Sequence, residues 1–117
     1  MLEDFLYDYA GYIAIALLFL CMALSIPVFA HGSLDVRLYA PVGSDRQTPH
    51  ERDEAYVVAR GSAEFVDGTG RHAVAPGSFV FVAAGETHRF EAMSDDFAVW
   101  VMFYGPPGGE RGSTPAG

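Results

Sequence analysis

Residues 54–82 read EAYVVARGSAEFVDGTGRHAVAPGSFVFV, and the expected fold of the domain is derived from this stretch first. Short runs rich in Val, Phe, Tyr and Ala alternate with Gly, Pro and Asp, which is the pattern of short β-strands joined by tight turns. The pair Asp67-Gly68 predicts a two-residue hairpin turn, because glycine accepts the positive φ angle that such a turn requires. The pair Pro76-Gly77 predicts the next turn along the chain.

The same pattern extends in both directions and predicts further strands. Together the expected strands cover residues 33–40, 54–59, 62–66, 71–75, 78–82, 87–91 and 97–104. Short strands with short loops and no helical periodicity favour a small, closed or nearly closed antiparallel β-barrel over residues 31–105. Large apolar side chains of the later strands are expected in its core, namely Phe79, Phe81, Trp100 and Phe103.

The N-terminal segment, residues 1–30, differs from the domain after it. Residues 9–30 contain no charged residue, and about 20 apolar residues in a helix span the core of a bilayer. We therefore expect the barrel to be preceded by one hydrophobic helix that crosses a membrane. Acidic residues precede this run, whereas Arg37 and Arg46 follow it, so the positive-inside rule places the barrel on the cytoplasmic side.

Two other interpretations of this segment stay open. It can be a secretory signal that ends at Ala30, although its acidic start differs from the basic start of such signals. Alternatively, translation begins at Met22, which would give a soluble cytoplasmic barrel. At the other end of the chain, residues 106–117 are rich in Gly and Pro and are expected to be a disordered tail.

Composition excludes several classes of function. The 117 residues carry a net charge of −8, and arginine is the only basic residue besides histidine. No basic stripe is available to neutralise phosphates, so a nucleic acid is not an expected partner. The single cysteine, Cys21, excludes a disulfide framework and a cysteine-based zinc site. A metal site in this chain has to use histidines and carboxylates.

The first part of a candidate site lies in residues 50–56, HERDEAY. Because side chains alternate between the two faces of a strand, His50 and Glu54 can point the same way, and Tyr56 continues that face. We expect the charged run at residues 51–53 to contact solvent. One face of this strand therefore presents a histidine and a carboxylate above apolar residues, which suits a polar site at the mouth of a barrel.

The second part of the site lies in residues 77–88, GSFVFVAAGETH. A strand leads into a tight glycine turn, and His88 opens the next strand. If that strand lies beside the first one, His88 meets His50 and Glu54. Two imidazoles and one carboxylate with open positions suit Fe(II), Mn(II), Ni(II) or Zn(II).

These two segments resemble the paired motifs of the cupin superfamily. Residues 50–61 keep the spacing of the first motif, with three residues between histidine and glutamate and six more before the glycine. Residues 77–88 keep the glycine, glycine and histidine spacing of the second motif. The resemblance covers residues 31–105. Three departures are that Thr48 stands where the family usually has another histidine, Ala83 where it usually has proline, and Ala92 where it usually has asparagine.

The resemblance implies a β-barrel jelly roll, often dimeric, with a divalent metal where the ligands are present. The implied metal ligands are His50, Glu54 and His88, with Thr48 and Tyr56 as further residues of the pocket. The expected function is binding of a divalent metal, a small molecule, or both. One alternative is a metal-dependent enzyme acting on a small metabolite, such as a dioxygenase, an isomerase or a lyase. Another is that the three side chains form a hydrogen-bonded polar cluster in a metal-free pocket.

Overall fold

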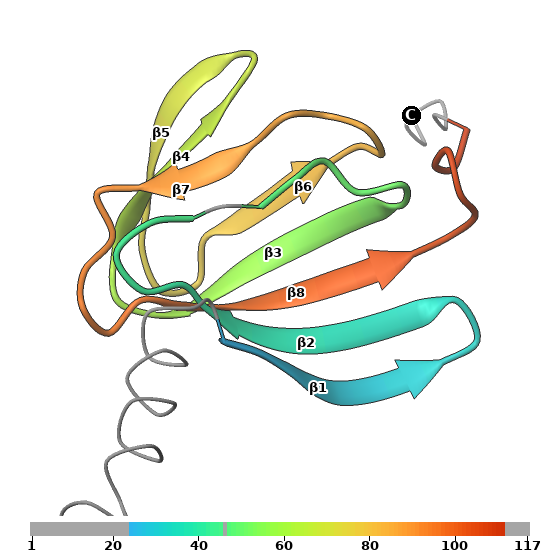
Figure 1. The fold of residues 1–117 in the computed structure, drawn as a ribbon, viewed down its shortest axis with the longest axis horizontal. Helices are drawn as coiled ribbons and strands as arrows, with labels where there is room; N and C mark the ends of the chain where they lie inside the picture. The colour runs from blue at the N-terminus through green and yellow to red at the C-terminus, as the bar shows by residue number, and fades with distance from the viewer. Residues whose placement is uncertain (1–23, 46, 112–117) are drawn as a thin grey trace, which may run out of the picture.

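The computed structural model describes residues 24–45 and 47–111, which form eight strands and, within these ranges, no helix. The strands are β1 (Leu24–His31), β2 (Leu34–Ala40), β3 (Asp53–Arg60), β4 (Ala63–Asp67), β5 (Gly70–Val74), β6 (Phe79–Val82), β7 (Arg89–Glu91) and β8 (Ala98–Tyr104). They form a five-stranded sheet in the order β1-β2-β8-β3-β6 and a three-stranded sheet in the order β5-β4-β7 (Figure 1). All pairs are antiparallel. The all-β prediction for the domain is therefore confirmed.

The prediction of an N-terminal helix over residues 1–30 is wrong for the part of this segment that the structure describes. Residues 24–30, the end of that helix, belong to β1, which pairs with β2 from Leu24 to His31. The register shifts between Pro27 and Phe29, and proline is tolerated there because β1 is an edge strand. An uncharged apolar run is compatible with either a helix or a strand, so its hydrophobicity alone could not separate them. Residues 1–23 lie outside the described residues.

The expected membrane-anchored location, with the barrel on the cytoplasmic side, is overturned by the same finding. Within the described ranges, no helix is long and apolar enough to cross a bilayer. A signal cleaved after Ala30 would remove most of β1. Met22, the alternative start, precedes the first residue that the structure describes.

The hydrophobic core lies between the inner faces of the two sheets. Its fully buried side chains include Tyr56 and Val99 from the larger sheet and Phe65 and Phe90 from the smaller one. Phe65 packs edge-on against Phe90, with 5.4 Å between the ring centroids. Aromatic rings thus fill most of the space between the sheets, and any polar group placed there needs a partner.

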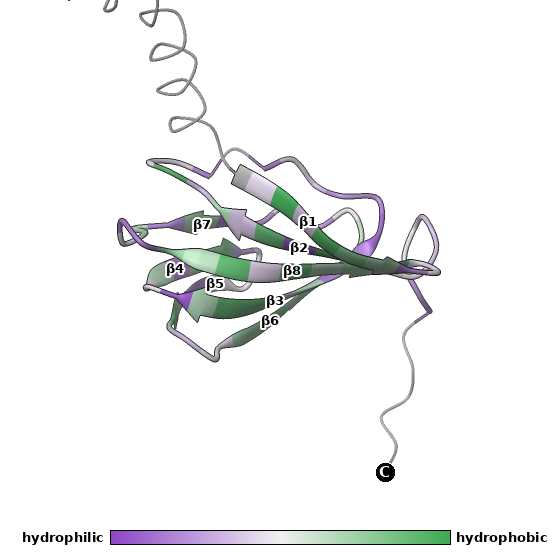
Figure 2. Ribbon diagram, turned by 90° about the horizontal axis from the view of Figure 1, so that it is seen from below, coloured by the Kyte–Doolittle hydropathy of each residue, from purple (hydrophilic) through white to green (hydrophobic). Residues whose placement is uncertain are grey.

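Three of the aromatic residues predicted for the core are instead exposed. Phe79, Phe81 and Trp100 are 66%, 49% and 36% exposed, whereas Phe103 packs partly buried against the core, as predicted. The reason is strand alternation: β6 directs Val82 inward, so its phenylalanines point outward. The strands β3, β6 and β8 are hydrophobic along most of their length (Figure 2).

Two apolar rows cross the outer face of the five-stranded sheet. Directly paired residues share a face, and the registers align Ile26, Leu38, Trp100, Val57 and Phe79 in one row and Phe29, Val36, Met102, Ala55 and Phe81 in the next. We call these ten residues the outer face. It contains no charged side chain and is the opposite side of the sheet from the core.

Gly61 follows β3 at a point where no side chain fits. Its φ angle is +77°, and a Cβ atom there would lie 2.4 Å from Oγ of Ser94 and 2.8 Å from Cα of Phe97. Gly77 also has a positive φ angle, +89°, but a Cβ atom there would meet no atom within 4 Å. A side chain at Gly77 would meet only an unfavourable backbone conformation, whereas a side chain at Gly61 would also overlap with neighbouring atoms.

We expect Gly61→Ala to lower the free energy of unfolding by about 3 kcal/mol, because the left-handed conformation costs roughly 1–2 kcal/mol and the overlap adds a similar amount. Gly77→Ala should lower it by only about 1 kcal/mol, since only the backbone conformation is strained. Urea unfolding followed by circular dichroism measures both values. Equal losses in the two variants would contradict the close packing at Gly61.

Candidate metal centre

His50, Glu54 and His88 come together between the two sheets from two segments that are far apart in the sequence. His50 lies in the loop before β3, Glu54 is the second residue of β3, and His88 directly precedes β7. One ligand atom from each residue lies within 4.8 Å of the others. The loops that precede β3 and β7 therefore deliver imidazoles to a carboxylate that the sheet itself positions, and this group could hold a metal ion.

Glu54 is the most unusual residue of this cluster. Its side chain is only 1% exposed, and neither carboxylate oxygen has a hydrogen-bond partner among the described residues. Nε2 of His88 lies 2.8 Å from Oε1, and Nε2 of His50 lies 3.9 Å from Oε2. The shorter contact is an ion-pair distance without hydrogen-bond geometry. A buried carboxylate without donors is costly, and two nitrogen ligands beside it make the donor set fit a divalent cation.

The ring of His88 is oriented by a backbone carbonyl. Its Nδ1 lies at hydrogen-bond distance, 3.0 Å, from the carbonyl oxygen of Glu86. A proton on Nδ1 leaves Nε2 as the nitrogen that faces Glu54, which is the arrangement common among metal-binding histidines. Burial by itself lowers the pKa of His88, but Glu54 and the Glu86 carbonyl together raise it above its ordinary value.

Tyr56 lies beside the cluster on the same face of β3. Its hydroxyl donates to Oε1 of Gln47 at 3.1 Å and lies 2.9 Å from Nε2 of His88. Burial, and after it the charge of Glu54, raises the pKa of Tyr56 well above its usual range. The hydroxyl therefore stays protonated and acts as a hydrogen-bond donor at the edge of the site.

Gln47, rather than Thr48, is the nearby residue of the preceding loop. Thr48 is exposed, whereas Oε1 of Gln47 lies 3.3 Å from Nε2 of His50. The amide is held in this orientation because its Nε2 donates to Asp45 at 3.1 Å. Strand alternation could not find Gln47, since it lies in the loop between β2 and β3. One signal in the sequence could have indicated Gln47: its side-chain amide oxygen is a possible metal ligand, and it directly precedes Thr48, where the family usually has a histidine.

Asp45 connects this loop to both sheets through hydrogen bonds. Its carboxylate accepts the hydroxyl of Tyr39 on β2 at 2.7 Å and the backbone N–H of Phe90 on β7 at 2.8 Å. It also accepts the backbone N–H of Gln47 at 3.2 Å. Because β2 and β7 belong to different sheets, one carboxylate joins both sheets to the loop that carries Gln47 and His50.

Asp53 fastens the other loops around the site. The run at residues 51–53 was expected to contact solvent, but Asp53 is buried. Its carboxylate accepts the backbone N–H groups of Ala84 at 2.9 Å and Glu110 at 2.7 Å. Residues 106–111 of the expected tail are thus held in place, with Gly108 N–H also donating to the Glu51 carbonyl at 2.7 Å. Residues 112–117 are outside the part that the structure describes.

A pocket of about 470 Å³ opens beside His50 on the inner face of β2 and β8. Its walls include Ser25, Asp35, Arg37, Gln47, His50 and Arg52. This volume lies in the range of small-molecule sites, about 300–1,000 Å³. Since His50 is shared by the cluster and the pocket wall, a molecule in the pocket would lie next to the metal centre.

Comparisons with solved structures show the same fold. The chain superposes on the crystal structure of the DMSP lyase DddQ from Ruegeria pomeroyi with a TM-score of 0.63, at 24% identity, covering 72% of this chain but only 47% of that protein. It superposes on TT1209 from Thermus thermophilus with a TM-score of 0.61, at 26% identity, covering 73% of this chain and 86% of the other. This chain thus spans about half the length of the lyase.

Sequence comparison identifies the family. The chain is 42% identical over 76 residues to an uncharacterized protein of Streptomyces coelicolor, a match that covers 63% of this chain and 72% of that protein. The model of the cupin domain matches residues 36–104. Because this match spans more than half of the sequence, the chain belongs to the cupin family.

Proposed function

We propose that this chain is a metal-binding cupin domain that holds one divalent ion on His50, Glu54 and His88 and binds a small molecule in the adjoining pocket. The observation that supports it best is the carboxylate of Glu54, which is buried beside two imidazoles while both its oxygens lack hydrogen-bond partners among the described residues. A divalent cation held between this carboxylate and the two imidazoles would compensate the buried charge.

The protein groups around the proposed ion have distinct roles. Glu54 supplies the negative charge, and His88 is held by the Glu86 carbonyl. His50 is the more accessible ligand, since its side chain is 35% exposed and lines the pocket. The Oε1 atom of Gln47 is a further oxygen close to His50. When bound, a divalent metal supplies Lewis acidity toward an oxygen of the small molecule.

The donor set favours a transition metal over magnesium or calcium. Two imidazole nitrogens and one carboxylate suit Fe(II), Mn(II), Ni(II) or Zn(II), whereas magnesium and calcium prefer oxygen ligands alone. The alternative function is a metal-dependent enzyme on a small metabolite, of the dioxygenase, isomerase or lyase class. Tyr56 would then act as a hydrogen-bond donor to the reacting molecule rather than as a base, because burial keeps its hydroxyl protonated.

Metal analysis of the purified full chain tests the proposed centre. We expect close to one equivalent of a divalent transition metal per chain, and a loss of at least about tenfold in metal content in His88→Ala and Glu54→Gln, because each removes a direct ligand. His72→Ala is the matched control, since His72 is an exposed histidine of β5. Inductively coupled plasma mass spectrometry after dialysis gives the values. Equal metal content in all four proteins would rule out the centre.

We further propose that a second copy of the chain covers the outer face. Its two apolar rows cross all five strands and include Phe79, Phe81 and Trp100, all exposed. Monomeric proteins rarely expose continuous apolar patches larger than a few hundred Å². Each chain carries a net charge of −8, but none of it lies in these rows, so two copies can meet face to face without burying like charges. A two-fold pairing of one surface with itself is the commonest form of oligomer.

Light scattering coupled to size-exclusion chromatography tests this pairing. The wild-type chain should elute with the mass of a dimer, and the double variant Phe79→Ser, Phe81→Ser with that of a monomer, because it removes the two large apolar contacts of β6. His72→Ala should remain a dimer. A monomeric wild-type chain would refute the pairing.

A further inference from the structure

We infer that the pocket beside the metal centre takes a small organic acid, whose carboxylate is held by Arg52 and Arg37. This inference rests on the proposed function in one respect: the other end of the molecule would reach the metal on His50, Glu54 and His88. Three features of the pocket support it: where the two guanidinium groups lie, which acidic groups they pair with, and the volume of the pocket that they border.

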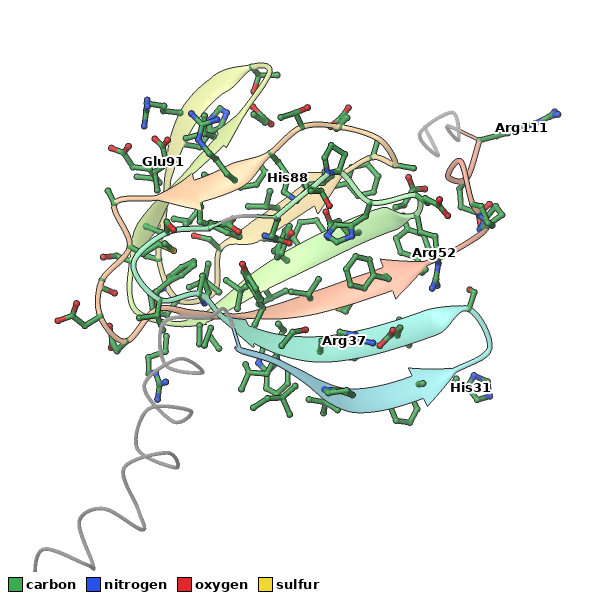
Figure 3. All side chains as sticks on the ribbon, viewed as in Figure 1. His31, Arg37, Arg52, His88, Glu91 and Arg111 are labelled. Carbon is green, nitrogen blue, oxygen red and sulfur yellow. The ribbon has the colours of Figure 1, made fainter. Side chains whose placement is uncertain are left out.

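Arg37 lies on the face of the sheet that carries the metal centre. It pairs opposite Val101 on β8, and Val101 pairs opposite Tyr56 on β3, so the three share the inner face. Neighbouring strands are about 4.8 Å apart, which puts the backbone of Arg37 roughly 10 Å from that of Tyr56. A molecule several bonds long would span this distance. Arg37 lies on β2 and Arg52 near the end of β8 (Figure 3), and both line the pocket.

The pairing of the charged groups leaves positive charge on the pocket wall. Both carboxylate oxygens of Asp35 accept bonds from Arg37 at 3.3 Å, so these two charges compensate each other. Arg52 has no ion-pair partner in the ranges that the structure describes. Its Nε donates to the Gly105 carbonyl at 3.1 Å, while its Nη2 is buried without any partner among the described residues. The other acid of the wall, Glu51, is exposed to solvent, where its charge is screened.

A carboxylate suits this wall better than a neutral group does. A guanidinium binds a carboxylate through two parallel charge-assisted hydrogen bonds, and such bonds are about twice as strong as neutral ones. The chain as a whole repels anions through its net charge of −8, so an acid needs a local positive group to be held. Arg52 supplies one uncompensated charge, which matches a single carboxylate. A phosphate monoester would bring about two negative charges and leave one of them unpaired.

Calorimetric titration of the full chain loaded with Zn²⁺ tests the inference. The probes are lactate, succinate and glutarate, each compared with its amide, and inorganic phosphate as an anion without a carboxylate. We expect at least one carboxylate to bind at least tenfold more tightly than its amide, and Arg52→Gln to abolish this preference. Arg37→Gln should weaken the same binding several-fold, whereas Arg52→Lys, which keeps the charge, should retain part of it.

The matched control is Arg60→Gln. The Nε of Arg60 also donates to a backbone carbonyl, that of Asp96 at 2.8 Å, but Arg60 is not part of the pocket wall. Its variant should bind the probes like the wild-type chain. Wild-type affinity in Arg52→Gln, or no preference for any acid over its amide, would refute the inference, and so would tighter binding of inorganic phosphate than of all three acids.

This design distinguishes a failure of the metal centre from a failure of the organic-acid inference. Metal content is measured on every variant, and Arg52→Gln should keep the wild-type level because Arg52 is not a ligand. Normal metal content with unchanged probe binding would refute the organic-acid inference and leave the metal centre intact. If the wild-type chain holds no metal, the metal centre fails, and titration of the metal-free chain with succinate and succinamide still decides whether Arg52 selects a carboxylate.

Discussion

The burial of the Glu54 carboxylate constrains the rest of the site. Its strand, β3, lies between β8 and β6, so the side chain enters the interior where the neighbours in register are Phe103 and Val82. The side chain of neither neighbour can donate a hydrogen bond. Compensation has to come from loops at the end of the sandwich, and the loops that carry His50 and His88 meet there. The chemistry of the centre therefore results from placing one charged residue in an otherwise apolar part of the sheet.

Asp45, Asp53 and Glu54 differ in whether their carboxylates accept hydrogen bonds from the backbone. Asp45 and Asp53 each accept hydrogen bonds from backbone N–H groups, and these bonds hold loops together. Glu54 accepts none among the described residues. An acid saturated by backbone donors has little left to offer a ligand, whereas an unsatisfied one does. The two aspartates thus build the frame, and the glutamate remains available for a cation.

Local rules predicted seven of the eight described strands, whereas features that depend on the assembled sheets were missed. The Asp67-Gly68 turn predicted the hairpin of β4 and β5. The two motifs predicted that His50, Glu54 and His88 meet, although His50 and His88 lie in the loops before β3 and β7 rather than on the strands. The β1 strand was mistaken for helix, because an uncharged apolar run carries no period that distinguishes the two. Exposed aromatic residues such as Phe79 and Trp100 were assigned to the core because their strands are apolar on both faces. Asp53 and Gln47 were missed because their partners lie in loops, whose geometry strand alternation does not predict.

The position of β8 in the larger sheet has a consequence for the order of events during synthesis. This is the last strand of the described residues, yet it pairs with both β2 and β3. The larger sheet therefore consists of two separate strand pairs, β1-β2 and β3-β6, until β8 has been synthesised. The contact of Gly108 with Glu51 requires a few residues more. Pairings between residues far apart in sequence are slow to form. The pocket is therefore completed only after β8 has been synthesised, and a chain that lacks β8 would expose the edges of β2 and β3 to its neighbours.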